Sequence, residues 1–295
     1  VVATSGDTGA AAIDAIKGKN NMNIFVLHPN NKISKVQRKL MTTGNDKNVF
    51  NIAIDGNFDD CQNLVKAMFS DLEFSKSIKM TGVNSINWAR IIAQSVYYFY
   101  CYYLIENNNK PINFSVPTGN FGDVYAGYLA KKIGLPVNKF IVATNQNDIL
   151  HRAISKGTYD LEKVAETISP SMDIQLASNF ERLIYDLNNH NDKKTIKAMK
   201  DIKENGKYLI SEENLNKIKN DFLSSSMNEN EVLNIIKNVH TKFNMILDPH
   251  TAIGYGAFDK VKLEGNNIVL ATAHPCKFPD AIEKAINIKS ELPNE

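Results

Sequence analysis

The sequence predicts an α/β protein with two lobes, each built on a parallel sheet. Short apolar runs alternate with helical patterns along most of the 295 residues. In addition, several of the expected strands lead into glycine-rich turns that open a helix. Strands that alternate with helices of this length are typical of βαβ units, in which neighbouring strands lie parallel. A hydrophobic content of 43% and a charged content of 22% fit a globular chain.

The first lobe is expected over residues 1–80 as a smaller, mobile α/β unit. Its apolar runs predict strands at residues 1–3, 24–27 and 49–54. Apolar residues spaced three, four and seven apart predict helices between them, at residues 9–17, 33–44 and 58–70. Gly18 and Gly44 are typical residues for ending the first two helices.

The second lobe is expected over residues 81–295 and continues the alternation. We expect helices at residues 87–105, 123–132, 212–222, 229–241 and 280–286, and strands at 112–116, 140–143 and 267–272. The composition turns polar over residues 157–207, where 188–194 is predicted to be a solvated excursion. The helix at 87–105 carries six aromatic residues between Tyr97 and Tyr103, which favours burial on several sides. Its apolar core, residues 91–105, is shorter than the roughly 20 residues that a bilayer requires.

Charge and cysteine content exclude several classes of protein. The 34 basic and 32 acidic residues give a net charge of +2, too small for the basic field that binds a nucleic-acid backbone. Cys61, Cys101 and Cys276 are odd in number and far apart, so we expect neither a disulfide framework nor a metal site. A reducing, cytoplasmic location follows. The sequence begins with Val1 inside an expected strand, without Met, so a processed chain or a fragment is expected.

Two strand-to-helix turns have the chemistry of anion sites. They are Thr4-Ser5-Gly6-Asp7-Thr8-Gly9 and Thr118-Gly119-Asn120-Phe121-Gly122-Asp123. Free N–H groups at a helix N-terminus attract a phosphate or carboxylate, although glycines can also serve only to allow a tight turn. Asp7 repels an anion, so it suits a hydroxyl partner or caps the helix. Neither turn matches the Walker A or the dinucleotide-binding motif.

Three further segments are candidates with structural alternatives. Thr272-Ala273-His274-Pro275-Cys276-Lys277 follows an expected strand, where ligands commonly bind. Arg90, in Asn84-Ser85-Ile86-Asn87-Trp88-Ala89-Arg90, can pair with a phosphate or form a structural salt bridge. Asp248-Pro249-His250-Thr251 is predicted to be a turn that enters a helix, with Thr251 as the cap.

With these segments assembled, the chain resembles the threonine synthases, pyridoxal-phosphate enzymes of the tryptophan-synthase-β-like fold. The resemblance runs from the first residue nearly to the last. It is carried by residues 3–9, 84–87, 116–123, 143–148, 169–174, 248–252 and 272–275.

The resemblance implies a role for each candidate residue. It implies that Gly119, Asn120, Phe121, Gly122 and Asp123 hold the cofactor phosphate, that Thr272 lies at the pyridine nitrogen, and that Asp7 lies near the ring hydroxyl. It implies that Thr4, Ser5, Gly6, Thr8 and Gly9 bind the substrate carboxylate. Ser85, Asn87 and Arg90 are the candidates for the substrate phosphate, with Lys32 and Lys277 as outer cations.

The implied reaction converts O-phospho-L-homoserine and water to L-threonine and phosphate. In this family the Schiff-base lysine precedes the carboxylate loop, which here begins at Thr4. We therefore expect that lysine to lie before residue 1, and the chain by itself to be inactive. A related lyase that releases 2-oxobutyrate, or a binding paralogue without activity, carries the same motifs.

Overall fold

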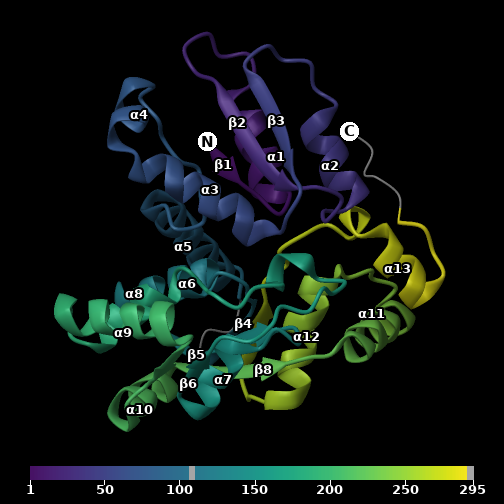
Figure 1. The fold of residues 1–295 in the computed structure, drawn as a ribbon. Coiled ribbons are helices and arrows are strands. Elements are labelled where there is room, and N and C mark those ends of the chain that lie inside the picture. The colour runs from purple at the N-terminus through teal and green to yellow at the C-terminus, as the bar shows by residue number, and fades with distance from the viewer. Residues whose placement is uncertain (106–109, 291–295) are drawn as a thin grey trace. The chain divides into compact units, whose positions relative to one another are not determined.

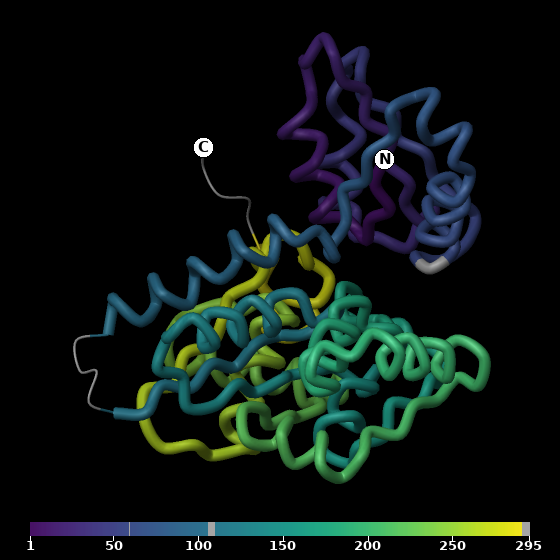
Figure 2. The backbone as a smooth tube through the Cα atoms, turned by 90° about the vertical axis from the view of Figure 1, so that its left-hand side faces the viewer, coloured from purple at the N-terminus to yellow at the C-terminus, as the bar shows by residue number. Residues whose placement is uncertain are grey.

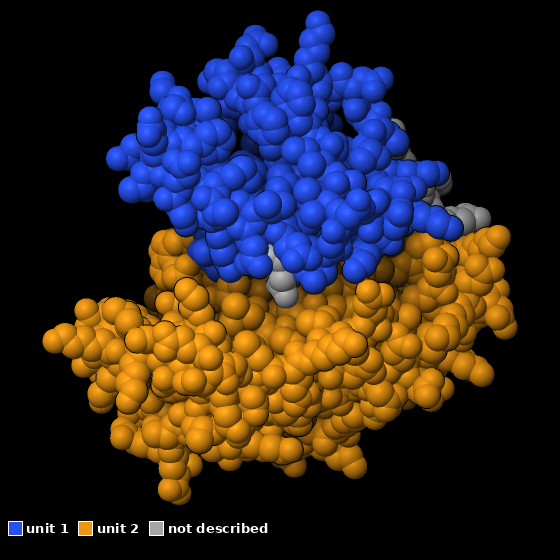
Figure 3. Space-filling model, in the orientation of Figure 1, with its two compact units in different colours: residues 1–87 blue, residues 88–295 orange. Residues whose placement is uncertain are grey.

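The computed structural model describes residues 1–105 and 110–290 and divides into two compact units, residues 1–87 and 88–295 (Figure 1, Figure 3). Each unit has a parallel sheet with helices packed on it. The predicted fold class, a two-lobed α/β protein with parallel sheets, is confirmed. The mobility and the binding roles that the sequence assigns to the lobes stay predictions. In the described part of the chain, no helix is long and apolar enough to cross a membrane.

Unit 1 is a parallel sheet of three strands in the order β1-β2-β3. Its elements are β1 (Val2–Ala3), α1 (Asp7–Ile16), β2 (Ile24–Pro29), α2 (Lys35–Thr42), β3 (Val49–Ile54), α3 (Phe58–Ser70) and α4 (Leu72–Ser77). Val2 pairs with Val26, and Ile24 pairs with Val49. The predicted strands and helices are confirmed, with α4 added to them. The core lies between the sheet and α1, where Val2, Val26, Ala12 and Ile13 are buried together.

Unit 2 is built on a parallel sheet of four strands in the order β8-β5-β4-β9. Its strands are β4 (Ile112–Pro117), β5 (Val137–Thr144), β8 (Phe222–Ser226) and β9 (Asn266–Val269), with an antiparallel pair β6 (Thr158–Asp160) and β7 (Lys207–Leu209) beside them. Its α-helices are α5 (Trp88–Tyr103), α6 (Gly122–Lys132), α7 (Ile149–Lys156), α8 (Phe180–Leu187), α9 (Asp192–Asn205), α10 (Glu212–Asp221), α11 (Glu229–Phe243), α12 (Pro249–Val261) and α13 (Pro279–Ile286). Two short 3-10 turns, η1 (Pro170–Met172) and η2 (Pro275–Lys277), complete it.

Both faces of the four-stranded sheet are buried, as parallel sheets require. Phe140 and Val142 of β5 point into the cluster that contains Tyr98 of α5 and residues of α6. Ile141 of β5 points to the opposite face, where it packs with Ile253 of α12. Near-continuous burial along β4 and β5 explains why these strands have no alternation of polar and apolar residues.

Residues 189–194 are exposed, which agrees with the solvated excursion predicted for residues 188–194. The rest of the polar stretch over residues 157–207 is mostly structured. It contains α8 and α9, joined by a short turn in which Asn189 and His190 have left-handed backbone conformations. Phe180, Leu183, Ile184 and Leu187 of α8 are buried at helical spacing. The strand β8 is also an addition, because its sequence, Phe-Leu-Ser-Ser-Ser, is too polar to signal a buried strand.

The aromatic helix α5 is buried on one side only, so the predicted burial on several sides is wrong. Tyr98 is fully buried, with its ring centroid 4.8 Å from that of Phe114. Tyr100 and Tyr103 are 63% and 80% exposed, because α5 lies along the outside of unit 2 (Figure 2). Val96 belongs to the same exposed stripe.

Candidate active site

The carboxyl ends of the four parallel strands of unit 2 gather the candidate residues of that unit at one edge of the sheet. Pro117 of β4 pairs with Ala143 of β5, and Ser115 of β4 pairs with Val269 of β9. The loops that follow these strands therefore leave the sheet side by side. In open α/β sheets this edge is where ligands bind.

The loop after β4 presents a row of backbone donors. Phe121 has a left-handed conformation with φ of 62°, and its buried ring packs at 5.3 Å from that of Phe180. Anchoring of the ring stabilises a conformation that a bulky residue rarely adopts. Among the described residues, no protein group accepts a hydrogen bond from the N–H groups of residues 119–124. Together with the dipole of α6, these donors fit a phosphate.

Gly119 has no room for a side chain. A Cβ at this position would lie 2.5 Å from the carbonyl oxygen of Ser171, so the η1 turn packs directly on the loop. The Ser171 N–H donates to Nε2 of His250 at 3.3 Å. His250 therefore connects the start of α12 to the turn that lies against Gly119.

The His250 ring is held by Asp248, and both side chains are buried. Nδ1 lies 2.9 Å from the carboxylate of Asp248. Because Nε2 accepts from Ser171, the ring proton is on Nδ1 and donates to Asp248. Asp248 also accepts from the backbone N–H groups of His250 and Thr251. The cap of α12 is therefore Asp248, which corrects the expected cap, Thr251.

Thr251 links the same carboxylate to the segment after β9. Its hydroxyl donates to Asp248 and accepts from the backbone N–H of Thr272 at 3.3 Å. The strand β9 ends at Val269 instead of at Thr272, and the Thr272 side chain is exposed. The predicted role of Thr272 at a pyridine nitrogen stays a prediction.

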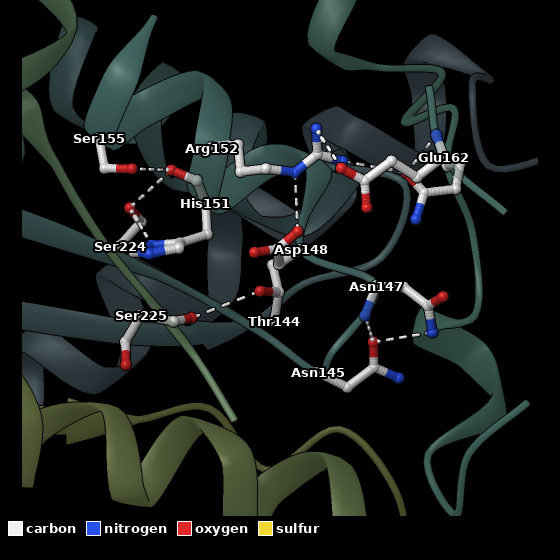
Figure 4. Close-up of polar contacts among 11 residues, drawn as sticks. Thr144, Asn145, Asn147, Asp148, His151, Arg152, Ser155, Glu162, Ser224 and Ser225 are labelled. Atoms are coloured by element: carbon white, nitrogen blue, oxygen red, sulfur yellow. Dashed lines mark hydrogen bonds and ion pairs between the residues drawn. The ribbon is translucent and has the colours of Figure 1, made fainter. Parts of the chain in front are cut away.

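A buried amide and hydroxyl network fastens the η1 turn to the end of β5. Nδ2 of Asn145 donates to the Ser169 hydroxyl at 2.9 Å and to the Asp173 carboxylate at 2.8 Å. Oδ1 of Asn145 accepts from the backbone N–H of Asn147 at 2.8 Å, as Figure 4 shows. Burial raises the pKa of Asp173, and its hydrogen bonds from Thr167 and Asn145 oppose that rise. The η1 turn against Gly119 is thus held both by His250 and by the network around Asn145.

Asp123 lies at the end of the loop after β4, and its side chain is turned toward the protein. Its carboxylate accepts from the Tyr98 hydroxyl at 3.1 Å, and that hydroxyl also donates to the Asp123 carbonyl at 2.7 Å. Burial raises the pKa of Asp123 to about 6, with the Tyr98 hydrogen bond acting against it. The side chain of Asp123 therefore contacts α5, while its N–H belongs to the donor row.

The candidate carboxylate loop lies in unit 1, between β1 and α1. The Thr4 hydroxyl is buried under the loop and accepts from the N–H groups of Gly6 and Gly9 at 2.9 and 2.8 Å. Two of the expected donors are therefore used within the loop. Ser5 and Thr8 are partly buried, as is Asp7, which has contacts of its own. The substrate-binding roles of these residues stay predictions.

The three candidates for the substrate phosphate are divided between the units. Ser85 and Asn87 belong to unit 1 and have contacts of their own, and Arg90 lies on α5 in unit 2. Nη1 of Arg90 is buried and contacts no hydrogen-bond acceptor in the described chain. Burial lowers the pKa of Arg90, which an anion would counteract.

Two residues have surroundings that the sequence alone did not predict. One is His250, whose positioning role depends on a contact with Ser171, 79 residues earlier in the chain. The other is Gln37, a buried amide beside Gly6. Its signal is the pattern Ser34-Lys35-Val36-Gln37, which is typical of a capping box.

Comparisons with known proteins find similar sequences that are threonine synthases. The family model "Threonine synthase, C-terminal" matches residues 251–295. Threonine synthase of Pseudomonas aeruginosa is 47% identical over 285 residues, covering 96% of this chain and 61% of that protein. The enzyme of Saccharomyces cerevisiae is 43% identical, covering 97% and 60%. The chain thus spans about three fifths of the length of these relatives.

Solved structures of threonine synthases also superpose on this chain. The structure of PLP-bound threonine synthase from Brucella melitensis superposes with a TM-score of 0.92 at 47% identity, covering 99% of this chain and 63% of that one. Threonine synthase from Escherichia coli gives 0.81 at 33% identity, covering 99% and 62%. Maize serine racemase, at 14% identity and a TM-score of 0.60, shares the fold alone.

Proposed function

This chain belongs to the threonine synthase family, and on that premise we propose that it carries the cofactor-phosphate and substrate-carboxylate loops of an enzyme that forms L-threonine. The proposed substrates are O-phospho-L-homoserine and water, and the second product is phosphate. The proposed cofactor is pyridoxal 5'-phosphate. The observation that supports this most directly is the row of unpartnered N–H groups at residues 119–124.

The cofactor, when bound, supplies an electron sink for the carbons of the substrate. The proposed part of the phosphate loop is to hold its phosphate with Gly119 to Asp123, without a charged side chain turned toward it. His250 keeps the Ser171 turn against Gly119 and so keeps the donors aligned. Thr272 would offer a neutral hydroxyl to the pyridine nitrogen.

The substrate would be held at its two anionic groups, the carboxylate and the phosphate. Thr4, Ser5, Gly6, Thr8 and Gly9 form the proposed carboxylate site, with the N-terminus of α1 supplying a positive dipole. Asp7 would lie near the ring hydroxyl of the cofactor. For the substrate phosphate the proposed residues are Arg90, Ser85 and Asn87. The buried, unpartnered Nη1 of Arg90 supports that choice.

Binding of pyridoxal 5'-phosphate to the 295-residue chain tests the cofactor loop. We expect saturable binding in the wild type and at least tenfold weaker binding in Gly119→Ala, since the new Cβ would meet the Ser171 carbonyl at 2.5 Å. Gly44→Ala is the matched control, because a Cβ there meets its nearest atom at 3.4 Å. Equal affinity in all three proteins would contradict the assignment.

Product analysis tests the reaction. The full-length protein is incubated with O-phospho-L-homoserine, and L-threonine, 2-oxobutyrate and phosphate are measured. Threonine and phosphate in equal amounts are expected, and 2-oxobutyrate would indicate the related lyase. That the cofactor-linking lysine lies outside residues 1–295 stays a prediction, which borohydride trapping on this chain and peptide mapping can check.

A further inference from the structure

Gln37 occupies the third position of α2 but does not act as the sequence pattern suggests. The Ser34 hydroxyl accepts from the Gln37 backbone N–H at 3.2 Å, which is one half of a capping box. In the other half, the glutamine side chain would return to the Ser34 N–H. Here neither Nε2 nor Oε1 of Gln37 has a hydrogen-bond partner among the residues that the structure describes. The Gln37 side chain therefore does not bond to the Ser34 N–H.

The Gln37 amide is buried as well as unpartnered. Only 1% of the residue is exposed. Buried amides are almost always paired, because loss of water without a new partner costs stability. A buried amide with both polar atoms unpartnered is therefore a candidate ligand for a bound group.

The amide lies against the carboxylate loop of unit 1. Its Cδ and Nε2 are 2.7 and 2.8 Å from the position that a Cβ on Gly6 would take. Gly6 has φ of +136°, a conformation that L residues with side chains rarely adopt. Glycine at this position therefore brings the backbone of the loop into contact with Gln37 and lets that backbone rotate.

The loop needs a donor that Gln37 can supply. In this structure Thr4 accepts from the N–H groups of Gly6 and Gly9, so a carboxylate at the loop would share these two donors or replace Thr4. A carboxylate has only acceptors, and the Nε2 of a glutamine carries two hydrogens. Gln37 is the orphaned buried side chain that contacts Gly6.

We propose that Gln37 is a ligand of the α-amino acid carboxylate, donating from Nε2 when the Ser5–Gly6 segment rotates and uncovers it. The inference rests on the proposed function, in which this loop takes the substrate carboxylate, and adds a binding residue from α2. It implies that the loop is closed over Gln37 in the free protein. Binding of the carboxylate then replaces an unpaired amide by a paired one.

The test compares Gln37→Met with Gln175→Met in the 295-residue chain. Methionine keeps the length of the side chain and removes its polar atoms. Gln175 is also buried, but its Oε1 accepts from Glu162 N–H and from Arg152, both at 3.4 Å. Thermal unfolding and calorimetric titration with L-threonine and with pyridoxal 5'-phosphate are measured for each protein.

For Gln37→Met we expect a higher melting temperature than wild type, at least tenfold weaker binding of L-threonine and unchanged binding of pyridoxal 5'-phosphate. For Gln175→Met we expect a lower melting temperature and wild-type affinity for L-threonine. A Gln37→Met chain that binds L-threonine like the wild type, or that is less stable, overturns the inference. So does a wild-type chain that binds pyridoxal 5'-phosphate but not L-threonine, whereas failure to bind pyridoxal 5'-phosphate counts against the proposed function.

Discussion

In unit 2, several buried side chains influence the candidate site by fixing the position of its backbone. In the loop after β4 the proposed phosphate donors are backbone N–H groups, so their geometry depends on the residues that hold this backbone. At the start of α12, Asp248 holds the ring of His250, and this ring accepts a hydrogen bond from the Ser171 N–H. The Ser171 carbonyl in turn lies against Gly119. Mutation of such a residue should mainly lower the free energy of unfolding.

His250→Ala is expected to lower the free energy of unfolding by about 2–4 kcal/mol. The substitution leaves the Ser171 N–H and one contact of the buried Asp248 carboxylate without a partner. Chemical denaturation of both proteins at neutral pH measures the difference. His190→Ala, at a side chain that is 63% exposed, is the control and should change stability by less than about 0.5 kcal/mol. Equal effects at the two positions would contradict the positioning role.

Asp123 should make the protein less stable as pH rises from about 4 to about 6. Its pKa is raised to about 6, so over this range the folded state keeps a proton that the unfolded state has lost. Stability then falls with pH, by on the order of 1–3 kcal/mol in total. Asp123→Asn removes the ionisable group and should flatten this part of the curve.

Urea unfolding at several pH values checks the Asp123 prediction. Asp14→Asn is the control, because the contact with Lys17 lowers the pKa of the exposed Asp14. A lowered pKa contributes stability that rises with pH, opposite in sign to Asp123, so Asp14→Asn should keep the fall in stability with pH. If Asp123→Asn keeps that slope as well, the carboxylate does not titrate near pH 6.

At the scale of elements, the strands and helices of unit 1 were predictable because the sequence pattern of each lies within the element itself. In β2 and β3 most residues are apolar, and in the helices apolar residues recur at spacings of three and four. The loops at Gly6 and Gly119 were recognisable as strand-to-helix turns from local sequence, and their role as anion sites stays a prediction. Partners such as His250 and Ser171 were not, since only the fold brings distant segments together.

The aromatic helix α5 shows a different limit of sequence reasoning. Its composition predicts burial all round, but burial depends on which elements pack on each side. In unit 2 the described elements cover the side of Tyr98 and leave Tyr100 exposed. Aromatic composition therefore indicated a packed helix without indicating how many of its sides are packed.

Two alanine substitutions on α5 measure this asymmetry. Tyr98→Ala is expected to cost about 3–5 kcal/mol, because it empties a site between Phe114 and Phe140 and removes a hydrogen bond to Asp123. Tyr100→Ala should cost less than about 0.5 kcal/mol. Denaturant midpoints of both variants provide the test, and a large loss at Tyr100 would show that its side of the helix is covered.

At the scale of the whole molecule, each unit has a hydrophobic core of its own. The core of unit 1 is small and centres on Val2, Val26 and Met41. Unit 2 has two larger clusters, one on each face of its sheet. Units with separate cores can unfold separately, and the smaller core supplies less stability.

Ligand binding should therefore act on one unfolding transition and not on the other. Pyridoxal 5'-phosphate, proposed to bind at Gly119 to Asp123, should stabilise unit 2 by about 2.7 kcal/mol at a concentration 100 times its Kd. For a unit of this size, at about 2–4 °C per kcal/mol, that corresponds to a rise of about 5–11 °C. Calorimetry resolves the transitions, and fluorescence of Trp88, the single tryptophan, assigns the one that contains α5. A shift confined to the other transition would mean that the cofactor binds through unit 1.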